Sequence, residues 1–166
     1  MGEFLFNRID DDKLEIVRRH VATHPVKVGA LANALGLKVV RAPLPPKISG
    51  LIQPCKESAS GYEIKVNKFE VPERQRFTVA HEIGHYLLHE PHIKSGIVDS
   101  IMYRSNLSSK KETEANKIAA EIIMPRIELE TALDRMGGLT SDDDVSQLAH
   151  DFRVSLPAMK IRLGAQ

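Results

Sequence analysis

The chain has 166 residues, 42% of them hydrophobic, which is the size of one compact domain with a small appendage. Its 23 basic and 22 acidic residues nearly cancel, so bulk charge gives no strong attraction to nucleic acid or anionic membranes. The single cysteine, Cys55, excludes an internal disulfide and a cysteine-based zinc site, and we expect it to be half-buried. No apolar run approaches the roughly 18 residues of a membrane span, and the first residues lack a signal-peptide pattern. These features predict a soluble, cytoplasmic protein.

Two short helices are expected first. The acidic run 10–12 precedes apolar residues at helical spacing, which predicts a capped amphipathic helix that Pro25 ends. Residues 28–35 predict a second helix, and Gly36 stands where a helix stop is expected. Small helix pairs of this pattern usually only pack together, so DNA binding is not the preferred interpretation.

A small antiparallel sheet is expected next. Residues 39–40 lead into the prolines of 43–46, which suits an edge strand and its exit. Residues 48–54 and 62–67 predict two further strands. The Ser- and Gly-containing stretch 56–61 between them is typical of a hairpin loop.

The most informative motif is H-E-x-x-H at residues 81–85, inside a segment with helical periodicity from 74 to 89. At about 3.6 residues per turn, His81 and His85 lie one turn apart on one face, so both imidazoles can bind one metal ion. Glu82, one step round, can reach a water on that metal without being a ligand itself. This is the zinc-peptidase arrangement.

The neighbours of the motif argue against a solvated polar face. Apolar residues cover most of the helix circumference, which indicates burial, and buried imidazoles and carboxylates need partners. Gly84 costs about 1 kcal/mol relative to alanine inside a helix, which suggests that another part of the chain approaches closely there. We expect Pro72 in the first helical turn and a polar loop over 90–108 after the helix.

A catalytic zinc needs a third protein ligand, and a second helix offers candidates. Ser109 begins a capping-box pattern, and apolar residues at helical spacing continue to Pro125. Glu112 falls on the inward arc of the helical wheel, whereas Glu114 and Glu121 project toward its margin or solvent. Glu112 is therefore the expected ligand. Two alternatives stay open: Glu112 serves only the capping box, or Glu114 is the ligand because the helix phase differs by a residue or two.

Two long stretches resemble the ImmA/IrrE family of metallopeptidases. They are 74–85 (RQRFTVAHEIGH) and 112–125 (ETEANKIAAEIIMP). The strand at 64–67 and the tail from 148 to 163 are similar to the family's pattern too, so the resemblance covers most of the chain. Ile118 stands where an aromatic residue is common, which is a mild change in packing.

The resemblance implies a small α+β zinc peptidase of the gluzincin type, a hydrolase with two histidines and a downstream glutamate as metal ligands. The family's Glu-x-x-x-Asn or Glu-x-x-x-Asp pattern selects Glu112 and Asn116. The amide of Asn116 would accept the second N–H of a ligand histidine. Family members with known roles cleave a helix-turn-helix repressor and so release transcription.

In the implied mechanism, zinc bound by His81, His85 and Glu112 lowers the pKa of its water to about 7. Glu82 takes the proton, positions the hydroxide against a peptide carbonyl and later hands the proton to the leaving amine.

The oxyanion needs one more donor, for which His92, Tyr103 and Arg104 are candidates among which the sequence does not choose. His89 continues the row of histidines by one turn. A supporting role in the site is one interpretation, but we expect helix drift to carry it off the metal.

The chain is expected to end as a helix, a turn and a helix, over 145–151 and 156–163, with Ser155 as an N-cap. Basic residues there are too few for a phosphate-binding face, so we expect packing on the core or binding of a protein partner. The expected organisation is a zinc metallopeptidase domain over 1–135 with a helix-turn-helix-like segment, 136–166, packed on it.

The preferred function is a zinc-dependent endopeptidase that cuts a specific protein, expected to be a helix-turn-helix transcriptional repressor. The alternative is a metal-stabilised partner of a repressor or toxin–antitoxin pair with little or no turnover. The presence of Glu82 favours the enzyme, because a purely structural site has no use for a general base. A DNA-binding regulator is a second alternative, and it predicts DNA affinity that falls steeply as salt rises.

Overall fold

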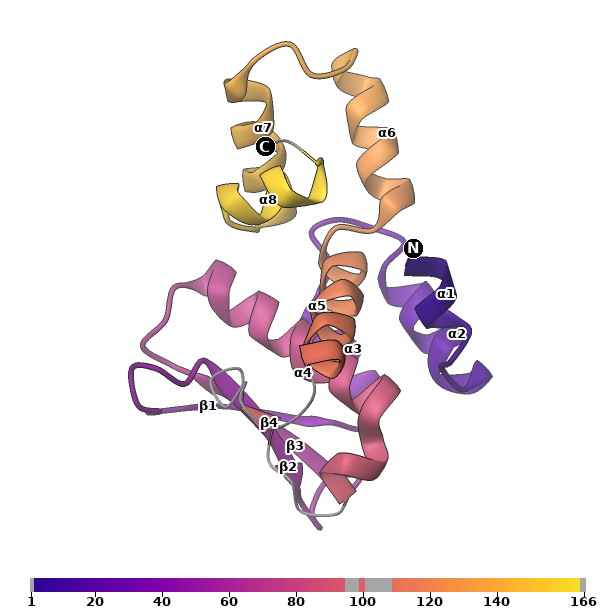
Figure 1. Ribbon diagram of the computed structural model, residues 1–166, viewed down its shortest axis with the longest axis vertical. Helices are drawn as coiled ribbons and strands as arrows, with labels where there is room; N and C mark the ends of the chain where they lie inside the picture. Colours follow the sequence, from indigo (N-terminus) through magenta and orange to yellow (C-terminus); the bar gives the residue numbers. More distant parts are fainter. Residues whose placement is uncertain (1, 95–98, 101–108, 165–166) are drawn as a thin grey trace.

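A four-stranded sheet forms one end of the molecule, and helices cover it and extend away from it along the long axis (Figure 1). The computed structural model describes residues 2–94, 99–100 and 109–164, and these ranges form the expected α+β fold with eight helices. In chain order the elements are α1 (Gly2–Phe6), α2 (Asp11–His20), α3 (Val28–Ala34), β1 (Lys38–Ala42), β2 (Gly50–Pro54), β3 (Tyr62–Asn67), α4 (Pro72–Lys94), β4 (Asp99–Ser100), α5 (Ser109–Ile123), α6 (Arg126–Met136), α7 (Asp142–Phe152) and α8 (Leu156–Arg162).

The strands lie in the order β1-β3-β2-β4. β2 and β3 form an antiparallel hairpin, and β4, which was not predicted, pairs antiparallel with β2. The β1–β3 pair is parallel, whereas an antiparallel arrangement was expected. After β1 the chain leaves a gap one strand wide before it forms β2, and β3 then fills this gap, antiparallel to β2 and parallel to β1. Within the described sheet β1 is an edge strand, as the prolines that follow it predicted.

Helix α4 lies against β2 and β3, with Pro72 as its first residue as expected. Ile52 and Ile64 are register partners with no exposed surface, and they belong to the same buried cluster as α4. Gly50 permits the close approach of helix and sheet, because a Cβ there would lie 2.4 Å from Cγ2 of Thr78 on α4. The sheet therefore fixes the position of α4.

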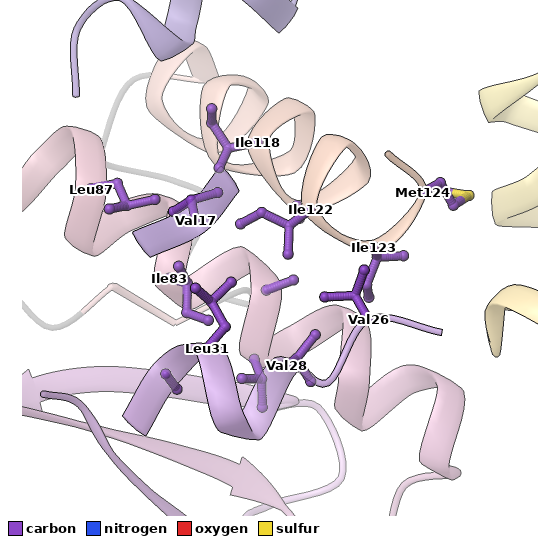
Figure 2. Close-up of a cluster of buried hydrophobic side chains, with 14 of the residues drawn as sticks. Val17, Val26, Val28, Leu31, Ile83, Leu87, Ile118, Ile122, Ile123 and Met124 are labelled. Carbon is purple, nitrogen blue, oxygen red and sulfur yellow. The ribbon is translucent and has the colours of Figure 1, made fainter. Parts of the chain in front are cut away.

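Helix α5 packs on α4, and the contact is tightest at Gly84. A Cβ on Gly84 would lie 3.0 Å from the carbonyl oxygen and 3.2 Å from the Cα of Ala115, which confirms the close approach expected there. Side chains from α2, α3, α4 and α5 fill the surrounding core (Figure 2). The labelled members of this core are Val17, Val26, Val28, Leu31, Ile83, Leu87, Ile118, Ile122, Ile123 and Met124.

Helix α4 runs on to Lys94, so the loop expected from residue 90 begins later than predicted. The helix is kinked at His89, where φ is −127° and ψ is 23°. Pro91 explains the kink, because it has no N–H for the carbonyl of Leu87 and its ring clashes with that carbonyl.

The N-terminal helices α2 and α3 are those expected, and Gly36 follows α3 with a positive φ of 79°. Helix α1 was not predicted. It packs on α5, and Leu5 within it and Ile9 after it are buried. Cys55 is half-buried, as expected.

Helices α7 and α8 form the expected pair, and Ser155 caps α8 by accepting a hydrogen bond from the N–H of Ala158. Helix α6 before them was not predicted. The pair is packed against the rest of the chain, since the rings of His24 and Phe152 stack with centroids 4.3 Å apart. The domain boundary at 135/136 stays a prediction. None of the helices in the described ranges is long and apolar enough to span a lipid bilayer.

Candidate metal centre and active site

The H-E-x-x-H motif lies in the middle of α4, at the face covered by α5. His81, Glu82 and His85 are each at most 1% exposed. The Nε2 atoms of His81 and His85 lie 3.1 Å apart, so both imidazoles point to one place as their spacing predicted.

Glu112 on α5 reaches the same place. Its two carboxylate oxygens lie 3.0 Å from Nε2 of His85 and 3.3 Å from Nε2 of His81. Ligand atoms around one tetrahedral ion such as zinc are separated by roughly 3.3 Å. Ligand atoms of these three side chains lie within 4.8 Å of one another, so the group could hold a metal ion.

The protonation of the group also suits a cation. Burial alone raises the pKa of Glu112, but the neighbouring imidazoles of His85 and His81 outweigh it and hold the pKa well below its usual range. The carboxylate is therefore ionised, as a metal ligand must be.

The second nitrogen of each imidazole is held by another side chain. Nδ1 of His81 lies 2.8 Å from Oδ1 of Asn116, so this nitrogen donates its hydrogen to the amide oxygen, as expected. Nδ1 of His85 lies 2.9 Å from Nδ1 of His89. With a hydrogen on each Nδ1, both Nε2 lone pairs face the carboxylate of Glu112, and a cation between them satisfies all three groups.

His89 lies off the expected metal position, as predicted, but it is part of the site. It is 3% exposed and contacts His85 on one side, while its Nε2 lies 3.3 Å from Oε1 of Glu114 on the other. Burial lowers the pKa of His89 to about 4, so its ring is neutral at neutral pH. The sequence offered a signal for this role, because Pro91 predicts a kink that changes the direction of the histidine row.

The competing glutamates have other partners. Glu114 was expected toward the margin or solvent, yet it is buried, because α1 covers it and Arg8 binds its carboxylate. Glu121 pairs with Arg162 at 2.9 Å. The carboxylate of Glu112 faces the imidazoles, which argues against a role in capping alone.

The structure describes only some of the remaining candidate residues. Both carboxylate oxygens of Glu82 are buried beside the histidine pair. His92 is half-buried in the last turns of α4. Tyr103 and Arg104 lie outside the described residues, so the choice of oxyanion donor stays a prediction.

A groove of about 1020 Å³ is lined by Asn116, the partner of His81, although neither histidine of the motif lines it. Its walls come from the start of α4, the second half of α5 and the helices α7 and α8. Asn116 joins the two features, because its exposed side chain lines the groove while its amide contacts His81. Apolar residues on the rim, Val71 and Ile161, are 62% and 79% exposed.

A buried His-His-Glu group on two neighbouring helices, with a glutamate following the first histidine, is the residue set of H-E-x-x-H metallopeptidases. The family described as the IrrE N-terminal-like domain matches residues 32–164, and the chain belongs to this family of metallopeptidases.

One relative supports the assignment, and a solved structure shares the fold. Over 75 residues, 45% of this chain and 23% of that protein, the sequence is 43% identical to the radiation response metalloprotease IrrE of Deinococcus radiodurans. A solved structure described as a Mycobacterium tuberculosis transcriptional regulator is similar over 98% of this chain and 50% of that one, with a TM-score of 0.59 and 17% identity. This second likeness concerns the fold alone. The chain spans half or less of the length of both relatives.

Proposed function

We propose that the protein is a zinc-dependent endopeptidase that cuts a helix-turn-helix transcriptional repressor in the cytoplasm. The observation that carries this proposal is the buried group of His81, His85 and Glu112 with Glu82 next to it. Two imidazoles and one carboxylate suit zinc well.

The residues divide the work as follows. Zinc held by His81, His85 and Glu112 would supply a Lewis acid and a water that ionises near neutral pH. Glu82 would act as the general base and then as the general acid, taking up a proton on its carboxylate and handing it to the leaving amine. Asn116 and His89 fix the orientation of the two imidazoles.

The groove is our proposed path for the substrate chain. It begins at Asn116, beside His81, and the apolar rim residues Val71 and Ile161 suit apolar side chains of a polypeptide. Proteolysis is supported by the description of one relative as a radiation response metalloprotease, and a repressor as the substrate by the resemblance to ImmA/IrrE proteins.

The test is whether the purified protein cleaves a helix-turn-helix repressor, beginning with any such protein encoded by a neighbouring gene. Glu82→Gln should keep the bound zinc but lower the cleavage rate by about 10²–10⁴-fold, because only proton transfer is removed. Glu15→Gln, an exposed change on α2, is the control and should cleave normally. A chelator should stop cleavage and added zinc should restore it. Undiminished cleavage by the Glu82 variant, or by metal-free protein, would show that the enzyme proposal is wrong.

The same assay on the wild-type protein separates the enzyme from a partner protein without turnover. If the wild type binds the repressor tightly but leaves it intact over many hours, the binding alternative holds. The DNA-binding alternative has little support, because Arg162 of α8 is already engaged by the carbonyl of Met124 and by Glu121.

A further inference from the structure

We propose that the N-terminal helix completes the metal centre: Arg8 positions His85 through a chain of side-chain contacts that passes through Glu114 and His89. This inference rests on the proposed metal site, and it concerns a segment that lies before the residues matched by the family. Arg8 acts here as a positioning residue and does not touch the substrate.

The chain of contacts joins the turn after α1 to the two helices α5 and α4. The guanidinium of Arg8, just after α1, binds Oε2 of Glu114 on α5. Oε1 of Glu114 lies 3.3 Å from Nε2 of His89, and Nδ1 of His89 lies 2.9 Å from Nδ1 of His85 on α4. His85, His89 and Glu114 are buried, so bulk water does not compete for the two contacts between them, while the side chain of Arg8 is 42% exposed.

The hydrogens along the chain can point in one consistent direction. Arg8 can only donate, so Glu114 remains a pure acceptor and takes a hydrogen from Nε2 of His89. His89 then presents a bare Nδ1, which accepts the hydrogen of Nδ1 of His85. This order leaves the lone pair of His85 on Nε2, the atom that faces His81 and Glu112. The position of Arg8 therefore selects the tautomer that binds a metal.

The two imidazoles differ in how they are held. His81 relies on Asn116, which belongs to the family-matched region. His85 relies on a path that ends at Arg8, outside that region. Leu5 and Ile9 are 7% and 4% exposed, so the apolar side of this segment anchors Arg8 next to Glu114.

The experiment measures zinc affinity of the full chain by competition with a chromogenic chelator. Arg8→Gln should weaken zinc binding by about 10–100-fold, the usual effect of losing an outer partner of a metal ligand. Arg8→Lys keeps the charge and should recover most of the affinity. Arg18→Gln, an exposed arginine on α2, should bind zinc as the wild type does. Glu114→Gln keeps the side-chain volume and should weaken zinc binding at least as much as Arg8→Gln does. This second variant keeps the inference testable if Arg8→Gln loosens the packing of α1.

A second readout distinguishes positioning from general stability. In the zinc-loaded protein, the Nδ1 hydrogen of His85 should exchange with solvent faster in Arg8→Gln than in the wild type, while that of His81 should be unchanged. Wild-type zinc affinity in both Arg8→Gln and Glu114→Gln would overturn the inference, as would equal acceleration at both histidines. These measurements do not use cleavage, so they stay informative if the peptidase proposal fails.

Discussion

The two histidines of the motif have outer partners of different chemistry. Asn116 offers an amide oxygen from α5, and His89 offers a ring nitrogen from the same helix as His85. The Asn116 contact could be predicted, because it needs only helical spacing and the inward face of one helix. Pro91 signals a kink near His89, but the contacts of His89 and Glu114 could not be predicted, since they depend also on a five-residue helix without periodicity.

Asn116 gives a test at the residue scale. Asn116→Ala removes the acceptor of the His81 hydrogen and should lower zinc affinity by about 10–100-fold. Asn116→Asp keeps an oxygen in the same place and should retain zinc, since a carboxylate accepts more strongly than an amide. Titration with a competing chelator measures both. Equal loss in the two variants would mean that the hydrogen bond is not the cause.

At the scale of elements, the site depends on how closely α4 and α5 approach. Gly84, in the interior of α4, indicated that another segment packs closely there, but the sequence did not indicate which segment. The helical wheel placed Glu112 on the inward face of α5. The close approach of the two helices at Gly84 brings that face next to the histidines. Helix α6 was missed although a signal existed: Leu129, Leu133 and Met136 recur at helical spacing and face inward.

Gly84→Ala tests the closeness of these helices. The added Cβ would meet main-chain atoms of Ala115 at 3.0 and 3.2 Å, so the backbone of α5 must give way slightly within a closely packed contact. We expect a loss of about 1–3 kcal/mol in the free energy of unfolding, more than alanine gains by helix propensity. Gly29→Ala on α3 is the matched control, because nothing lies within 4 Å of its Cβ position, and it should stabilise by up to about 1 kcal/mol. Urea unfolding compares the two; a stabilised Gly84 variant would refute the expectation.

At the scale of the whole molecule, the groove is formed by segments that are far apart in the sequence. The start of α4, the second half of α5 and the C-terminal helices all contribute to it. Sequence patterns predicted most of these helices one by one. They could not predict the groove, nor the parallel direction of β1, because both depend on pairings between distant segments.

Ile161→Glu tests the groove as the path of the substrate. Ile161 is 79% exposed on the rim, so a charge there should leave stability unchanged. It should raise KM for the repressor about tenfold with little change in kcat, because an apolar contact is replaced by a charge that must be desolvated. Ile127→Glu on α6 is equally exposed at 76%, lies away from the groove and should have no effect. Matching KM values for the two variants would place the substrate elsewhere.

One guanidinium forms hydrogen bonds to regions that are far apart in the sequence. Arg76, in α4 before the histidines, donates to the carbonyl oxygens of Val26, Phe152 and Arg153 at 2.9, 3.4 and 3.2 Å. If the last two helices detach, the carbonyl oxygens of Phe152 and Arg153 lose this donor, and only the oxygen of Val26, in the connection between α2 and α3, keeps it. We therefore expect the catalytic helix and the last two helices to open as one cooperative unit in hydrogen exchange, whichever end of the chain is strained first.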